Sequence, residues 1–128
     1  MPLIKSFRDL NVYKLARQET QKIYLRSRNF PTEEKYSLTD QIRRSSRAVK
    51  AMVAEAWARR RYRAVFINKI DEALGEATET QSWLDDCLDC GYISVDEFKQ
   101  MDAAWQSIGA MLNKMNARAD DFCGKSNN

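Results

Sequence analysis

The alternation of apolar and polar residues along the chain predicts four long helices. In each segment, apolar residues recur every three or four positions, which places them on one face of a helix with 3.6 residues per turn. The helices are expected at residues 9–28, from between 32 and 38 to about 61, at 62–90, and from 94 onward. Helices of this length joined by short connections favour an all-α fold, an up-down-up-down antiparallel four-helix bundle.

The apolar stripes of these helices form the expected core. The first two stripes are Leu10, Tyr13, Ala16, Thr20 and Ile23, and then Leu38, Ile42, Ser45, Val49, Met52 and Ala56. The third is Ile67, Ile70, Leu74, Ala77, Gln81, Leu84 and Leu88, and the fourth is Phe98, Met101, Trp105, Ile108, Leu112, Met115, Ala119 and Phe122. We expect one domain over residues 1–124, followed by a disordered tail at 125–128.

Residues that favour helix ends mark the boundaries of these segments. The pairs Ser6–Asp9 and Ser94–Glu97 have the spacing of a capping box, in which each side chain accepts a hydrogen bond from the backbone of the other residue. Pro31 ends the first helix because the residue before a proline avoids the α conformation. Gly91 is the expected C-terminal cap of the third helix. No glycine or proline separates the second helix from the third, so a tight corner or a kink is expected there.

Composition is typical of a globular protein. A chain of 128 residues, 44% hydrophobic and 30% charged, suits one domain, and four glycines and two prolines are too few for a β-rich fold. No run approaches the roughly 18–20 apolar residues that span a bilayer, and the first ten residues hold too short an apolar run for a signal peptide. Three cysteines, an odd number, suit a reducing compartment. We therefore expect a cytoplasmic protein without membrane contact.

Charge is divided unequally between the two halves of the chain. Residues 1–63 hold 16 Lys/Arg and 6 Asp/Glu, whereas residues 64–128 hold 5 and 12. Such a dipolar molecule can recognise a partner electrostatically, or its halves can simply neutralise each other inside one bundle.

Two further stripes lie opposite the apolar ones. The basic stripe of the second helix is Arg43, Arg47, Lys50, Ala54, Trp57 and Arg61, and the acidic stripe of the third is Lys69, Glu72, Glu76, Glu79, Trp83 and Asp86. Aromatic side chains on an outward face, flanked by complementary charges, are typical of protein interfaces. The alternative is that these charges are solvated and the tryptophans are half covered by neighbours.

Pairing of the two stripes between copies of the chain would join two different surfaces. Such heterologous contacts close into rings or continue as filaments, and a closed ring suits a globular protein better. The residues expected at this homo-oligomer interface are Arg43, Arg47, Lys50, Trp57, Glu72, Glu76, Glu79 and Trp83.

A basic run with an aromatic residue follows the second helix. Such a run can neutralise phosphates and stack a base, and repetition around a ring would strengthen binding. The expected nucleic-acid-binding residues are Arg44, Arg59, Arg60, Arg61, Tyr62 and Arg63, supported by Lys14, Arg17, Arg26 and Arg28 of the first helix. The alternative is a solvated helix end whose arginines complement the helix dipole, with Arg59 paired to Glu55.

Catalytic chemistry has little support in the sequence. The chain has no histidine, which excludes Ser-His and Cys-His catalysis and histidine-ligated zinc. Cys87 and Cys90 form a lone C-x-x-C within a predicted helix, without the βαβ setting of a redox motif or a second pair for zinc. The glutamates of the acidic stripe point away from the core, where burial cannot tune them for acid–base work. We expect no catalytic residue, no metal site and no cofactor.

Several ordered motifs resemble a known family. FRDLNVYKLA, FPTEEKYSLTDQIRRSSRAV, AEAWARRRY, GEATETQSWLD and CLDCGYI, from Phe7 to Ile93, are similar to the four-helix-bundle proteins encoded in bacterial 23S rRNA intervening sequences. The family's Gln-x-Arg-Arg segment falls on Gln41, Arg43 and Arg44, its Ala-Glu segment on Ala54 and Glu55, and its basic turn on Arg59 to Arg61. Relatives often carry an asparagine where Met52 stands, so any polar contact made by that asparagine is absent.

The resemblance implies a pentameric ring. A distant relative, the accessory variability determinant of diversity-generating retroelements, is a basic ring that binds nucleic acid and a reverse transcriptase. Together with the stripes, the resemblance favours a non-enzymatic homo-oligomer that binds RNA or DNA, with a protein such as a reverse transcriptase as a further partner. The rival hypothesis is a homo-oligomeric interaction scaffold without a nucleic-acid role, and a small enzyme is a weaker third.

Overall fold

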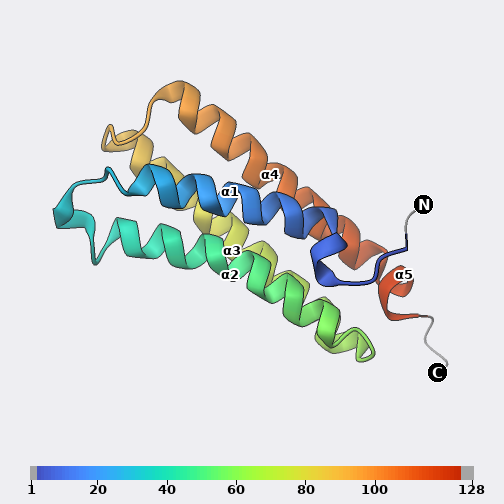
Figure 1. Cartoon of the computed structure of the whole chain (residues 1–128). Helices are drawn as coiled ribbons and strands as arrows, with labels where there is room; N and C mark the ends of the chain where they lie inside the picture. Colours follow the sequence, from blue (N-terminus) through green and yellow to red (C-terminus); the bar gives the residue numbers. More distant parts are fainter. Residues whose placement is uncertain (1–2, 125–128) are drawn as a thin grey trace.

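The computed structural model describes residues 3–124, all of whose long elements are helices (Figure 1). The elements are η1 (Phe7–Asp9), α1 (Asn11–Ser27), η2 (Thr32–Glu34), α2 (Leu38–Ala58), α3 (Arg63–Asp89), α4 (Val95–Ala117) and α5 (Ala119–Cys123). No strand occurs in this range, and the tail expected at 125–128 lies outside it. Over the same range, no helix is both long and apolar enough to cross a bilayer.

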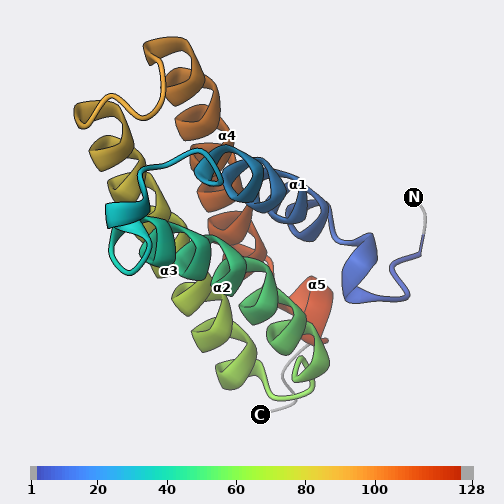
Figure 2. The same ribbon diagram turned by 60° about the vertical axis from the view of Figure 1, so that its left-hand side comes forward.

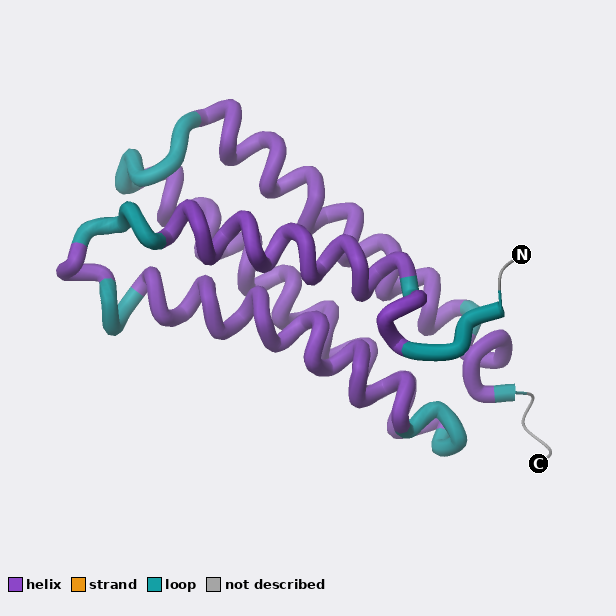
Figure 3. The backbone as a smooth tube through the Cα atoms, in the orientation of Figure 1, coloured by secondary structure: helices purple, strands orange, loops and turns teal. Residues whose placement is uncertain are grey.

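The four long helices form an up-down-up-down bundle, as predicted. Helix α1 packs on α2, α2 on α3, α3 on α4, and α4 returns to α1 (Figures 1 and 2). Two loops, at residues 28–37 and 90–94, lie at one end, which we call the loop end (Figure 3). The turn between α2 and α3, η1 and α5 lie at the opposite end, which we call the corner end (Figure 3).

The core follows the predicted apolar stripes in α1, α2 and α4. All five residues of the first predicted stripe are buried. The fourth stripe is buried at Trp105, Ile108, Leu112, Met115 and Ala119 and half-buried at Phe98, Met101 and Phe122. In α2 the predicted stripe is buried except for Met52, which is half-buried, and Val53 is buried as well.

The predicted stripe of α3 is wrong at four positions. Ile67, Leu74, Gln81 and Leu88 are only half-buried, whereas Phe66, Ala73, Thr80 and Cys87 are completely buried. Because α3 packs against both α2 and α4, its buried face is broad, and small or hydroxyl-bearing residues take its centre. The Thr80 hydroxyl fits there because it hydrogen-bonds the Ser45 hydroxyl of α2 at 2.8 Å and the Glu76 carbonyl at 2.9 Å.

The capping residues act as predicted, except that one box caps a different helix. Ser94 and Glu97 form a complete capping box at the start of α4. Ser6 and Asp9 also form one, but it caps η1; the chain turns at Leu10 and α1 begins only at Asn11. The Lys5 N–H, which donates to the Asp9 carboxylate at 2.9 Å, lowers the pKa of that carboxyl.

The fourth helix is shorter than predicted. It ends at Ala117 because Arg118 leaves the helical conformation, with φ −113° and ψ 35°, and the chain restarts as α5. This break turns the last predicted core residue, Phe122, towards α3, where its ring stacks on Phe66 with the centroids 5.7 Å apart. The apolar pattern continues through the break because both segments face the same core.

Polar contacts join α1 and α4 at the loop end. The Arg26 guanidinium donates to the Glu97 carboxylate at 2.6 Å and to the Tyr92 carbonyl at 2.7 Å. The Tyr92 hydroxyl donates to the Glu34 carboxylate at 2.8 Å, and this bond raises the pKa of Tyr92 to about 12. Arg26, expected among the nucleic-acid-binding residues, is therefore held in a structural network.

Candidate nucleic-acid interface

The turn between α2 and α3 carries the basic run as a tight corner. The Arg59 N–H bonds the Glu55 and Ala56 carbonyls at the end of α2, and the Tyr62 N–H returns to the Arg59 carbonyl at 2.9 Å. Helix α3 starts directly after Tyr62, so four residues reverse the chain without a glycine or proline. A compact corner of this kind presents its side chains outward, and Tyr62 is 56% exposed.

The structure gives the four corner arginines different surroundings. Arg59 and Arg61 are exposed, and neither forms an ion pair or a side-chain hydrogen bond within residues 3–124. The Arg61 guanidinium lies 5.2 Å from the centre of the Tyr62 ring. These two arginines and the exposed ring are the groups of the corner that remain available to a phosphate backbone and a base.

The other two corner arginines are engaged inside the molecule. Arg60 folds back over Trp57, with its guanidinium 3.8 Å from the ring centre and a 2.8 Å hydrogen bond to the Trp57 carbonyl. Arg63, in the first turn of α3, pairs with Asp120 of α5. Since α3 has no acidic residue in its first turn, this aspartate also offsets the positive helix end. Glu55, the alternative partner of Arg59, instead lies 3.4 Å from Lys69.

Arg44 does not join this cluster. It lies 15 residues before Arg59 on α2, which is about 22 Å along a straight helix. Its guanidinium donates to the Gln41 side chain at 2.7 Å, and its charge acts on Glu76 of α3. The structure thus separates Arg44 from the Arg59–Arg63 group with which the sequence analysis placed it.

The basic residues of α1 are also spread along the bundle. Lys14 is exposed in the first turn of α1, at the corner end, and Arg17 is exposed nearer the middle, whereas Arg28 lies at the loop end, far from the corner. These positions follow from the length of α1, which runs the whole bundle. Of these residues, only Lys14 lies at the same end of the bundle as the corner.

Other basic residues, absent from the sequence prediction, do gather at the corner end. They are Lys5 and Arg8 around η1 and Lys114 and Arg118 at the end of α4. Residues 3–10, 57–66 and 111–124, which form this end, hold eight Lys/Arg and three Asp/Glu. The loop-end residues 26–37 and 85–99 hold four and seven. The predicted antiparallel topology was enough to predict this basic end, because it already placed these segments at the same end of the bundle.

The basic stripe of α2 faces α1 more than was expected. The Arg43 guanidinium donates to the Ser27 hydroxyl at 2.8 Å and lies 4.8 Å from the centre of the Tyr24 ring, with Arg47 at 5.5 Å from the same ring. Arg43, which the sequence predicts at the homo-oligomer interface, thus already has partners in α1. Lys50 and Trp57 are half-buried, and only Arg47 and Arg61 are exposed.

The acidic stripe of α3 adjoins α2. Lys69 lies 3.3 Å from Glu72, and this hydrogen bond, with the charge of Glu55, raises the pKa of Lys69. Burial, a hydrogen bond to Glu79 and the charge of Glu79 raise the pKa of Glu76, against the opposing effect of Arg44. Trp83 is half-buried, and its Nε1 atom has no hydrogen-bond partner within residues 3–124. The basic stripe lies on the side of α2 that meets α1, and the acidic stripe lies on α3, so they are separate surfaces of one chain.

The cysteines are placed differently from one another. Cys87 is fully buried as a small core residue, and burial raises the pKa of its thiol to about 12, which keeps it protonated at neutral pH. Cys90 is exposed at the end of α3. Within residues 3–124, no three His, Cys, Asp or Glu side chains are grouped to hold a metal ion.

Comparison with known proteins places the chain among similar bundles. Residues 8–114 match the family described as 23S rRNA-intervening sequence protein. A crystal structure of a protein of unknown function from the S23 ribosomal protein family of Bacteroides thetaiotaomicron superposes with a TM-score of 0.75. It is 27% identical, and the match covers 83% of this chain and 95% of that one. No curated protein matches the chain.

Proposed function

The chain belongs to the family of 23S rRNA-intervening sequence proteins, and from this premise we propose that it is a nucleic-acid-binding accessory protein. The corner end of the bundle is the binding surface, and copies of the chain assemble into a homo-oligomeric ring, a pentamer as the family resemblance implies. The supporting observation is the collection of eight Lys/Arg and three Asp/Glu at one end of the bundle, with Arg59, Arg61 and Tyr62 exposed.

The mode of binding follows from the chemistry of that end. Exposed guanidinium groups contact phosphates whatever the base sequence, and each neutralised phosphate releases counterions. The Tyr62 ring offers a surface on which an unpaired base can stack. No helix inserts base-reading side chains at this corner, so binding depends on the backbone of the nucleic acid and little on its sequence.

The test is binding of the purified protein to mixed RNA and DNA fragments between about 50 and 300 mM salt, with the mass of the protein recorded in the same buffers. Wild type is expected to bind with an affinity that falls steeply with salt. Replacement of Arg59 and Arg61 by Ala should weaken binding. It should also flatten the plot of log affinity against log salt by about one for each phosphate that is no longer neutralised.

The matched control removes the same charge from the opposite end. Arg28→Ala with Lys99→Ala changes two exposed residues of the loop end and should leave the salt slope unchanged. Absence of binding at low salt by an intact oligomer would overturn the nucleic-acid role and favour the rival hypothesis, an interaction scaffold. Equal losses in both double variants would show that net charge, not the corner, governs binding.

A further inference from the structure

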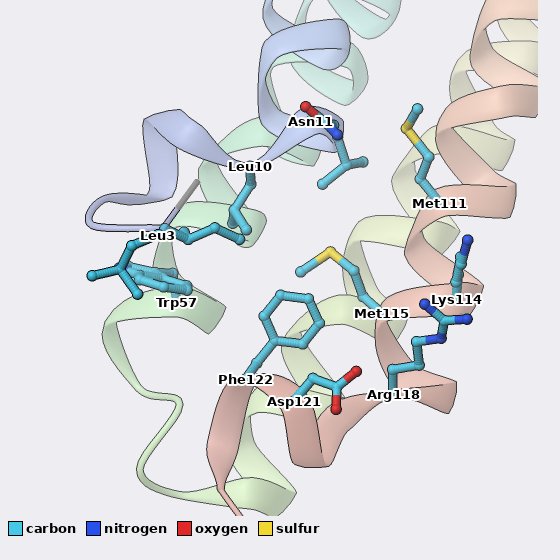
Figure 4. A pocket seen from close by; sticks show the side chains of 12 residues that line it. Leu3, Leu10, Asn11, Trp57, Met111, Lys114, Met115, Arg118, Asp121 and Phe122 are labelled. Carbon is cyan, nitrogen blue, oxygen red and sulfur yellow. The ribbon is translucent and has the colours of Figure 1, made fainter. Parts of the chain in front are cut away.

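A cavity of about 660 Å³ opens at the corner end, beside the basic corner but separate from it (Figure 4). The start of the chain, with Leu3, Leu10 and Trp57 of α2, forms one wall (Figure 4). The end of α4 and α5 form the facing walls, where Met115 and Phe122 point into the space (Figure 4). Sites for small molecules have volumes of roughly 300–1,000 Å³, so this cavity has the size of a ligand site.

The walls of the cavity are mainly apolar. Their apolar members are Leu3, Ile4, Leu10, Val12, Trp57, Met111, Met115 and Phe122. Two methionines and two aromatic rings make a surface that adapts to a flexible chain. Leu3 remains 78% exposed at the rim, an apolar side chain that an occupant of the cavity would cover.

The polar residues of the cavity are unevenly distributed. Lys114 and Arg118 lie one helical turn apart on the same wall, Asp121 lies beside Arg118, and Asn11 stands on the side of α1 (Figure 4). Neither cation forms an ion pair or a side-chain hydrogen bond within residues 3–124. Like charges four residues apart repel each other, and an anion between them would relieve that repulsion.

We propose that this cavity binds an amphipathic anion, a carboxylate at the end of a single apolar chain. The chain lies against Leu10, Met115 and Phe122, and the carboxylate lies between Lys114 and Arg118. Lys114, Arg118 and Asp121 together carry a net charge of +1 (two positive charges and one negative), which favours a ligand with a single anionic group. Lys114 and Arg118 are among the eight basic residues counted at the corner end, but the inference rests on the cavity and uses none of the Arg59–Arg63 corner, so failure of nucleic-acid binding would leave it standing.

The first experiment is a calorimetric titration of the full protein with dodecanoate below its micelle concentration. We expect saturable binding of one molecule per chain, with affinity that rises from octanoate to dodecanoate by up to about fourfold per methylene. Dodecanol, which has the same chain without the charge, should bind about tenfold more weakly, and dodecyltrimethylammonium more weakly still. A second arm with vesicles of anionic phospholipid distinguishes a membrane acyl chain from a free carboxylate: only the free acid should bind.

Two variants locate the site. Lys114→Gln with Arg118→Gln should reduce dodecanoate affinity about tenfold and leave dodecanol affinity unchanged. Met111→Trp fills the cavity and should abolish binding of both, in protein whose helicity matches wild type. Arg28→Gln with Lys99→Gln removes equal charge from the loop end and should change neither. Failure of folded wild type to bind dodecanoate, or unchanged binding in Met111→Trp, would overturn the proposal.

Discussion

Gly91 has a backbone conformation that disfavours any residue with a side chain. Its φ of +74° lies in the left-handed region, where a Cβ atom is disfavoured. The Gly91 N–H bonds the Leu88 carbonyl at 3.0 Å, and the Tyr92 N–H bonds the Cys87 carbonyl at 2.9 Å. This pair of bonds is a Schellman motif, so the sequence prediction of a C-terminal glycine cap is confirmed together with its geometry.

Substitution of Gly91 and Gly75 by alanine should have opposite effects on stability. Neither added Cβ atom meets another atom within 4 Å, so only backbone preferences differ. Gly91→Ala should lower the free energy of unfolding by about 1 kcal/mol, the cost of a left-handed alanine. Gly75→Ala, at an exposed position inside α3, should raise it by about 0.8 kcal/mol. Denaturant unfolding at one protein concentration measures both, and changes of the same sign would contradict this account.

Buried hydroxyl groups are hard to predict from the sequence, because their burial depends on a partner in another helix. Ser45 was predicted to lie in the apolar stripe and is 1% exposed, because its hydroxyl bonds Thr80 across the core. The apolar pattern of α3 gave no reason to bury Thr80, since a hydroxyl is unfavourable in a core without a partner. Its partner lies 35 residues away, and only the register of α2 against α3 brings the two together.

Among the helices, the predicted buried residues are correct for α1 and displaced by one residue at four positions of α3. Helix α1 shows one dominant apolar stripe, and its predicted core residues are all buried. Every long helix has two neighbours, but α3 contacts its own more extensively than α1 does, so its buried face is broader. Periodicity alone therefore placed four of its seven predicted residues one position too late. The sequence could not show whether the basic stripe of α2 faces solvent or α1. The spacing of residues predicts which face of a helix they share, but not what covers that face. The Arg59–Arg63 group, which is local in sequence, could be predicted as a cluster, whereas Arg44 could not.

The contact between Arg26 of α1 and Glu97 of α4 should make the free energy of unfolding depend on pH in the acidic range. The Arg26 hydrogen bond lowers the pKa of Glu97 below its ordinary value of 4.5, so this carboxylate stabilises the fold above the unfolded pKa. That stabilisation is lost as the pH falls through 4.5 to the lower pKa of the folded state. Because Glu97 is 36% exposed, solvent screens the pair, and its contribution is only about 0.5 kcal/mol.

Glu97→Gln should therefore be less stable than wild type by about 0.5 kcal/mol above about pH 5, with a difference that shrinks as the pH falls further. The glutamine keeps a side-chain oxygen for the Ser94 N–H, so the start of α4 is retained. Glu33→Gln removes the same charge from an exposed residue that forms no ion pair within residues 3–124. Urea unfolding at pH 7 and pH 3.5 gives the free energy of unfolding of both variants. If this free energy changed equally with pH in the two variants, the role of Arg26 would be refuted.

The charge of the whole molecule is arranged by ends as well as by halves of the chain. The sequence showed a basic first half and an acidic second half, which the bundle places as neighbouring helix pairs. The antiparallel topology adds a second division, with a basic corner end and an acidic loop end. In a closed ring, every copy would present its corner end on the same side, which concentrates positive potential there. The charge pattern and the proposed assembly thus support the same function.

The proposed ring can be tested on the acidic stripe without disturbing the corner or the cavity. If the stripe packs against the basic stripe of another copy, Trp83→Ala should lower the mass measured by light scattering, because a large, half-buried indole would leave the interface. Arg47→Glu changes an exposed residue of the basic stripe and should do the same through repulsion, without a cavity in the core.

Leu25→Ala is the matched control for both variants, because it removes an apolar side chain that is 50% exposed on α1, outside the two stripes. It should keep the wild-type mass. Far-UV circular dichroism must show unchanged helicity in all three, so that a lower mass reports assembly and not unfolding. A mass equal to wild type in Trp83→Ala and Arg47→Glu would exclude these stripes as the interface. A lower mass with weaker RNA or DNA binding would link the ring to the corner, since each copy contributes one basic patch and avidity falls when the patches separate.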